Sequence, residues 1–187
     1  APALLVRDLP LGIRSVNRHR RGPHLGTCPL AGAAVLAVVL LFVGRDATYA
    51  QGAKATSAVE LARAAERLKP GQWVWAPEIA PAGPMTVYVD LSAQIATVYR
   101  NGVRIGVSTV SSGKPGHETP TGVFVILQKD ATHHSKKYND APMPYQERLT
   151  WDGVALHAGG LPGYPESHGC IHLPLEFSRL LFGATSL

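Results

Sequence analysis

The chain has 187 residues, of which 45% are apolar and 17% are charged, and this balance excludes a wholly disordered protein. Its two cysteines exclude a disulfide-rich scaffold and a four-cysteine zinc site. The net charge of +5 does not indicate nucleic-acid binding, because residues 1–50 carry six arginines and two aspartates, whereas the rest carries twelve basic and eleven acidic side chains.

Residues 1–50 have the parts of an export signal. The apolar run 30–43 follows four arginines and precedes the small residues 47–50. As a helix this run of about 14 residues would be about 21 Å long. It is therefore shorter than the helix of roughly 20 residues that spans a bilayer. We expect a signal peptide cleaved after Ala50, or else an uncleaved membrane anchor; a buried core helix is the remaining alternative. Both leader interpretations place the rest of the chain in the periplasm or cell envelope.

The next segment predicts a short helix followed by a linker. Ser57 and Glu60 form a capping-box pattern, and apolar residues follow at the spacing of one helix face. Residues 70–84 hold four prolines and two glycines, which is typical of a linker. Trp73 and Trp75 are its expected packing anchors.

From residue 85 the apolar period changes to two, which is typical of strands. The pair Asn101-Gly102 is a strong hairpin signal, and Gly183 is the expected end of a closing helix. A mainly β, antiparallel sandwich or barrel with few short helices is therefore predicted. The expected elements are strands at residues 85–91, 94–100, 103–110, 121–128 and 153–157, a polar loop at 129–150 long enough to suggest function, and a helix at 174–182.

The segment from His157 to His172 carries the residues best suited to chemistry. Cys170 is a good nucleophile as thiolate, but a free pKa near 8.5 leaves little thiolate at pH 7 without a base. The glycines and prolines between His157 and Cys170 allow the chain to fold back and bring the two side chains together. Gly169 gives backbone N–H groups access to a reacting carbonyl, as an oxyanion hole requires.

Residue types alone leave three interpretations open. The first is thiol catalysis by Cys170 with a histidine base. The second is a metal site, since His157, His168, Cys170 and His172 are all possible zinc ligands. The third is that these residues are structural and perform no chemistry.

The tetrad Ser167-His168-Gly169-Cys170, with His157 upstream, resembles the signature of the L,D-transpeptidase catalytic domain, the YkuD-like family. Residues 89–94, 112–122 and 141–145 resemble further family segments, in the family's order. The resemblance implies a β-rich fold, a cysteine nucleophile and a peptidoglycan substrate, and we expect no metal and no cofactor. The domains are then a leader at 1–50, a helix and linker at 51–84, and the catalytic domain at 85–187.

By this resemblance Cys170 is the nucleophile and His157 the base. Many members have arginine or asparagine two residues after the cysteine, where this chain has His172, and members usually close with one more strand after a segment like 182–185. The expected substrate-binding residues are Ser167, His168, Gly169, His172 and Tyr145.

The implied reaction begins when Cys170 attacks the carbonyl before the terminal D-alanine of a tetrapeptide stem. An amine of another stem would then give a cross-link, water would give an L,D-carboxypeptidase, and a protein lysine would give attachment. The expected partners are peptidoglycan stem peptides and not nucleic acid, with residues 30–43 as the candidate membrane tether. A zinc-binding hydrolase and a catalytically silent wall-binding module are the rival functions.

Overall fold

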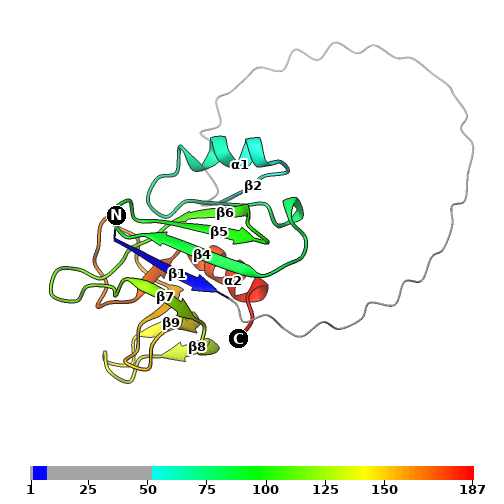
Figure 1. Ribbon diagram of the computed structural model, residues 1–187. Helices are drawn as coiled ribbons and strands as arrows, with labels where there is room; N and C mark the ends of the chain where they lie inside the picture. Colours follow the sequence, from blue (N-terminus) through cyan, green and yellow to red (C-terminus); the bar gives the residue numbers. More distant parts are fainter. Residues whose placement is uncertain (1, 8–51) are drawn as a thin grey trace, which may run out of the picture. The chain divides into compact units, whose positions relative to one another are not determined.

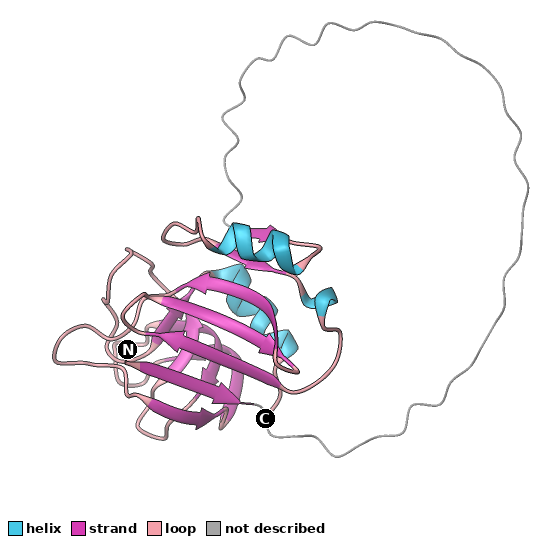
Figure 2. Ribbon diagram, turned by 45° about the horizontal axis from the view of Figure 1, so that its top comes forward, coloured by secondary structure: helices cyan, strands magenta, loops and turns pink. Residues whose placement is uncertain are grey.

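The structure, a computed structural model, describes residues 2–7 and 52–187 and builds them into two β-sheets and two α-helices (Figures 1 and 2). The strands are β1 (Ala3–Arg7), β2 (Gly52–Lys54), β3 (Trp73–Trp75), β4 (Met85–Asp90), β5 (Ile95–Arg100), β6 (Val103–Thr109), β7 (Gly122–Val125), β8 (Gln128–His134), β9 (Pro142–Arg148), β10 (Ala155–Ala158) and β11 (Ile171–Leu173). The helices are α1 (Ala58–Ala65), the 3₁₀ turn η1 (Pro77–Ile79) and α2 (Leu175–Ala184). The first sheet has the order β2-β3-β6-β5-β4-β1-β7 and the second β11-β10-β9-β8, so the mainly β fold is confirmed.

The larger hydrophobic core joins both sheets to α2. Val89 of the first sheet, Leu156 of the second and Phe177 of α2 all belong to it and are fully or almost fully buried. A smaller core, which includes Leu61 and Val74, holds α1 against the outer part of the first sheet. Among the described residues no helix is long and apolar enough to cross a membrane.

Residues 3–7 belong to the predicted leader, yet they form β1 within the first sheet, between β4 and β7 (Figure 1). β1 runs antiparallel to β4 and parallel to β7. Its alternate side chains Leu4 and Val6 are buried in the larger core, and its neighbours satisfy backbone groups on both edges. The apolar run 30–43 and the predicted cleavage site after Ala50 lie outside the described residues, so the division into leader and domain stays a prediction.

The helix predicted after residue 56 is present as α1. Ser57 Oγ accepts from the Glu60 N–H at 3.2 Å, and the Glu60 carboxylate accepts from the Thr56 N–H at 2.8 Å. The predicted linker at 70–84 is wrong in part, because it contains β3. The segment forms a strand because β3 pairs with two neighbouring strands, β6 and β2. The indole of Trp75, an expected anchor, meets the Phe177 ring edge-on at 5.5 Å.

The predicted polar loop at 129–150 is also wrong, because most of it is the hairpin of β8 and β9. The two strands pair in antiparallel register from Gln128–Arg148 to Asp130–Gln146 and again from Thr132–Pro144 to His134–Pro142. Their side chains are largely polar, so no alternation of apolar residues predicts the two strands from the sequence.

Helix α2 runs through Gly183, which was expected to follow its end. Lys129 of β8 provides the stop: its Nζ donates to the carbonyls of Phe182 and Thr185 at 2.5 and 2.7 Å. A lysine at a helix C-terminus satisfies the last carbonyls and interacts favourably with the helix dipole. Glu147 lies 4.0 Å from the same ammonium and accepts a hydrogen bond from the Thr185 hydroxyl.

The register of the second sheet separates a core face from a reactive face. Glu147 is opposite Lys129 and Leu156, and Leu156 is opposite Ile171, so these side chains share the face that packs on α2. Since successive side chains of a strand point to opposite faces, the neighbouring positions share the other face. These positions are Gln128, Asp130, Gln146, Arg148, Ala155, His157 and His172, with Cys170 just before β11.

Candidate active site

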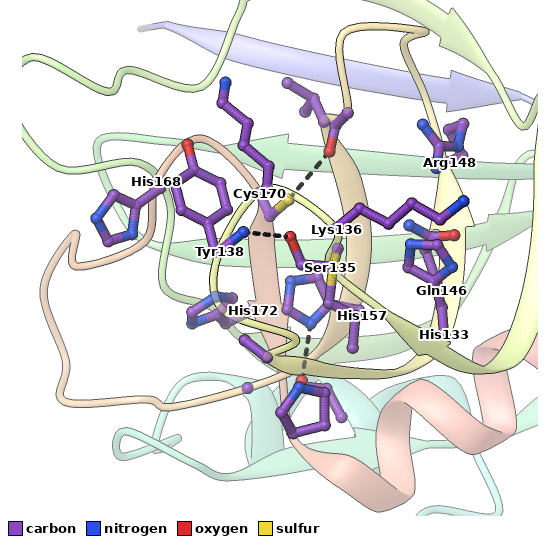
Figure 3. Close-up of a pocket in the computed structure, with 18 of the residues that line it drawn as sticks. His133, Ser135, Lys136, Tyr138, Gln146, Arg148, His157, His168, Cys170 and His172 are labelled. Carbon is purple, nitrogen blue, oxygen red and sulfur yellow. Dashed lines mark hydrogen bonds between the residues drawn. The ribbon is translucent and has the colours of Figure 1, made fainter.

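A pocket of roughly 750 Å³ lies over the reactive face of the second sheet (Figure 3). Cys170, His157 and Arg148 belong to its lining, and the turn of the β8–β9 hairpin, residues 135–138, forms one wall. The predicted nucleophile and the predicted base therefore line one pocket, on neighbouring strands or just beside them.

Cys170 is held as a protonated thiol. Its Sγ lies 3.5 Å from the carbonyl oxygen of Gly153, to which it donates. Burial raises the pKa of the Cys170 thiol above its ordinary value, and the N–H of Ala155 and the charge of Arg148 offset only part of that rise. The protein therefore holds little Cys170 thiolate at neutral pH, and attack of this sulfur on a carbonyl would need a base.

His157 has the properties of that base. Its Nδ1 lies 2.8 Å from the carbonyl oxygen of Ala158; a carbonyl only accepts, so Nδ1 carries the proton and Nε2 has the free lone pair. Burial first, and then the competition of the neighbouring His172 ring for protonation, lower the pKa of His157 to about 4. The imidazole is therefore neutral at pH 7 and able to accept a proton.

His172 lies beside His157, because parallel pairing sets the two residues opposite each other. Its Nδ1 lies 3.2 Å from the carbonyl oxygen of Gly160, and burial lowers its pKa. The ring also packs closely on Gly159, where a Cβ would come within 2.5 Å of the imidazole. His172 is thus a neutral, fixed part of the pocket wall.

Ser167 shapes the turn before the thiol and does not face the pocket. It is buried, and its Oγ donates to the Cys170 carbonyl at 2.5 Å and accepts from the Gly169 N–H at 3.1 Å. Because the Gly169 N–H is engaged in this way, the structure does not support it as an oxyanion donor. Gly169 instead supplies the positive φ of 116° that the turn needs.

Thr119 is a brace of the same turn that sequence reasoning missed. Its hydroxyl donates to the Gly169 carbonyl and accepts from the Gly113 N–H, both at 2.9 Å. A lone threonine in a loop carries no signal of such a contact, since the two partners lie 50 and 6 residues away.

His168, in the turn before the thiol, lines the pocket and is exposed to solvent. Its ring centroid lies 4.8 Å from that of His117 and 4.9 Å from that of Tyr138, and Figure 3 shows the rings of His168 and Tyr138 side by side. Desolvation, followed by the charges of Lys114 and His117, lowers the pKa of His168. His168 therefore connects the turn before the thiol to the β8–β9 hairpin.

Tyr145, an expected substrate contact, is not brought into the pocket. Its backbone has a φ of 57°, a rare conformation for a bulky side chain. Its ring packs on Phe182 of α2 with centroids 5.8 Å apart. The residues that β9 does present to the pocket are Gln146 and Arg148.

Gln146 and Arg148 were missed because their segment was expected to be a loop. With that segment as a strand, the two-residue spacing alone puts them on one face. Arg148 Nε donates to Gln128 Oε1 at 3.0 Å, across the β8–β9 pair.

The side chains considered as zinc ligands do not all contact one another. His157 meets His172, whereas His168 meets His117 and Tyr138. Across residues 2–7 and 52–187, no three histidine, cysteine or acidic side chains form a group that could hold a metal ion.

Comparisons with known proteins give a matching family and similar proteins. Residues 84–186 match the YkuD family, the L,D-transpeptidase catalytic domain. L,D-transpeptidase 1 of Mycobacterium tuberculosis is 32% identical over 115 residues, which cover 52% of this chain and 45% of that protein. The chain thus spans less than half the length of this curated relative.

Two solved structures are also similar. An L,D-transpeptidase from Mycobacterium tuberculosis H37Rv is 22% identical with a TM-score of 0.51, covering 57% of this chain and 64% of that chain; this likeness concerns the fold. An L,D-transpeptidase from Stackebrandtia nassauensis is 32% identical with a TM-score of 0.49, covering 53% of this chain and 49% of that chain.

Proposed function

Because the chain belongs to the L,D-transpeptidase catalytic domain family, we propose that it is a cysteine acyltransferase acting on peptidoglycan tetrapeptide stems. One observation carries the proposal: Cys170 and the neutral imidazole of His157, its Nδ1 tied to a carbonyl, line one pocket. This arrangement gives a nucleophile and a base with a fixed tautomer.

In the acylation step, Cys170 Sγ attacks the carbonyl carbon before the terminal D-alanine while His157 Nε2 takes the thiol proton. Attack and proton transfer must be coupled, because the imidazole is a weak base and the buried thiol a weak acid. The amide N–H of Cys170 itself is the donor nearest the sulfur along the chain and is suited to the developing oxyanion. His157 then protonates the leaving amine as the C–N bond breaks, and a thioester remains.

In the second step the acceptor nucleophile attacks the thioester carbonyl while His157 Nε2 takes its proton. The C–S bond then breaks, and His157 gives that proton to the Cys170 sulfur. An amine of a second stem gives a cross-link, which is the reaction we propose. Water would make the protein a carboxypeptidase, and a lysine of an envelope protein would make it an attachment enzyme. Family membership implies action on the cell wall and hence an exported protein; location in the periplasm or envelope, with a tether through residues 30–43, is part of the proposal.

The decisive experiment is intact-mass spectrometry of the purified protein after incubation with tetrapeptide stems. We expect a covalent adduct equal to the stem without its terminal D-alanine, mapped to Cys170, and cross-linked products when a second stem is added. Cys170→Ala is the control and should give no adduct. Failure of the unmodified protein to form any adduct would refute the proposal.

A further inference from the structure

We propose that Arg148 binds a carboxylate of the donor stem beside the nucleophile, with Gln146 accepting from an N–H group next to that carboxylate. The identity of the ligand as a stem rests on the proposed function. The site itself rests on the geometry of β9.

The guanidinium of Arg148 is held in one orientation and has N–H donors available for a ligand. It is half-buried on the reactive face, opposite Ala155 of β10. Its Nε donates to Gln128 Oε1 at 3.0 Å, which fixes the guanidinium plane and leaves both terminal nitrogens for another partner. No ion pair between described residues includes Arg148. The adjacent acid, Glu147, lies on the other face with Lys129.

The charges around the pocket favour an anion. Arg148, Lys136 and Lys137 are the lysines and arginines of its lining, and Asp152 is the acidic residue among the described residues there. His157 and His172 are neutral at pH 7 because burial lowers their pKa values. Lys136 and Lys137 are exposed and screened by solvent, whereas the half-buried Arg148 is screened less. Arg148 is therefore the cation best placed to bind a carboxylate through two parallel hydrogen bonds.

Gln146 supplies an independent observation. It lines the pocket two residues before Arg148, is only 1% exposed, and its Oε1 has no hydrogen-bond partner among the described residues. A buried oxygen without a partner costs free energy in the empty pocket, and an N–H donor from a ligand removes that cost. Together the two side chains fit a carbon that bears both a carboxylate and a nitrogen.

A donor stem offers this chemistry in two places. The terminal D-alanine bears a carboxylate and the amide N–H of the scissile bond. A diamino acid in the stem has a side-chain end that bears a carboxylate and an ammonium. The shared chemistry is the proposal, and the experiments separate the two sources.

The first experiment needs no stem. Iodoacetate and iodoacetamide alkylate the same thiol and differ only in their carboxylate, so the ratio of their rates on Cys170 reports an anion site beside the sulfur. We expect Arg148→Gln to lower the iodoacetate-to-iodoacetamide ratio about tenfold and Arg148→Lys to keep part of it. Arg104→Gln, which removes an equal charge from an exposed position on β6, should leave the ratio unchanged. An equal ratio in the unmodified protein and in Arg148→Gln would overturn the proposal.

The second experiment identifies the carboxylate. Acylation is measured with a free-acid stem, a stem amidated at its C-terminus and one amidated at the side-chain end. For the free-acid stem, Arg148→Gln should raise KM about 10- to 100-fold, and the amide that removes this difference identifies the bound group. An equal fall in kcat for all three donors, with unchanged KM, would show a merely structural arginine.

Gln146→Leu separates binding from folding. Replacing a buried amide whose oxygen has no hydrogen-bond partner by an apolar side chain should leave the melting temperature unchanged or raise it, while KM for the same stem rises. Lower stability with unchanged KM would overturn the role of Gln146. If no stem acylates the unmodified protein while the alkylation ratio responds to Arg148, the proposed function fails and the anion site stands.

Discussion

His157 and His172 lie opposite each other on the parallel strands β10 and β11, and their rings meet edge to face with centroids 4.9 Å apart. The contact buries His157 and makes its protonation compete with that of His172, and both effects lower its pKa. The neighbouring ring therefore favours the uncharged form of His157. This relationship determines how the protein should respond to pH.

The free energy of unfolding should fall as the pH drops from 6.5 to 4. His157 becomes protonated near pH 6.5 in the unfolded chain and near pH 4 in the folded chain. Between these pH values the unfolded state therefore binds more protons. The loss attributable to His157 is about 3 kcal/mol. Urea unfolding at a series of pH values measures it. His157→Gln should keep only the smaller slope due to His172, whose pKa is also lowered; an unchanged slope in this variant would contradict the assignment.

Acylation should hardly change between pH 5.5 and 8, with its acid limb near pH 4, because the neutral imidazole is the base throughout that range. Alkylation of Cys170 by iodoacetamide should instead rise about tenfold per pH unit up to pH 9, since it follows the thiolate of a thiol whose pKa is raised by burial. Stopped-flow measurements of both reactions test this contrast. Two superimposable profiles would show that a preformed thiolate performs the acylation.

His157 and His168 should not be interchangeable. His157→Gln should slow single-turnover acylation by about 10²–10⁴-fold, the usual contribution of a general base. His168 is exposed and contacts Tyr138 of the hairpin, so His168→Gln should mainly raise KM. The base would be His168 if the acid limb of the acylation profile disappeared in His168→Gln and remained in His157→Gln.

Cys170→Ala should form no acyl-enzyme and should unfold at a denaturant concentration close to that of the unmodified protein. Cys170→Ser should be nearly inactive, because an alkoxide is much harder to generate than a thiolate. Turnover of stems by the alanine variant, measured by mass spectrometry, would exclude Cys170 as the nucleophile.

Leu4→Ala should destabilise the catalytic domain by about 2–5 kcal/mol, the usual cost of truncating a buried leucine, because Leu4 is fully buried between the sheets. Leu5 is the matched control: it is the adjacent residue of β1, points to the other face and is only half-buried, so Leu5→Ala should cost less. Denaturant unfolding of both variants measures the difference. Equal, negligible effects would mean that β1 is not part of the folded sheet in solution.

Elements defined by local signals were predictable from the sequence. Asn101-Gly102 joins β5 to β6 with positive φ at both residues, and Ser57 caps α1. Elements that depend on distant partners were not. β3 lies in a proline-rich segment and is a strand because β6 pairs with it, and β1 pairs with residues of β4 that lie 79 to 87 positions away.

The candidate site divides in the same way. Residue type and spacing made Cys170 and His157 candidates, the family resemblance assigned their roles, and the structure puts both side chains in the pocket. Arg148 and Gln146 were missed because their strand has no apolar alternation. Tyr145 was expected to bind substrate, but its positive φ accompanies a ring packed on Phe182, away from the pocket.

The position of β1 means that the contacts of this strand in the first sheet are distinct from its covalent link to the rest of the chain. Residues 3–7 are held by main-chain pairing on both edges and by two buried side chains, and none of these contacts depends on the peptide bonds between residues 7 and 52. A chain cut within that interval would still present a complete sheet, assembled from two fragments, until the short fragment dissociates. Fragment complementation is therefore a direct test of the position of β1: a synthetic peptide with the sequence of residues 2–7, added in excess to a chain that begins at residue 52, is expected to restore the sheet.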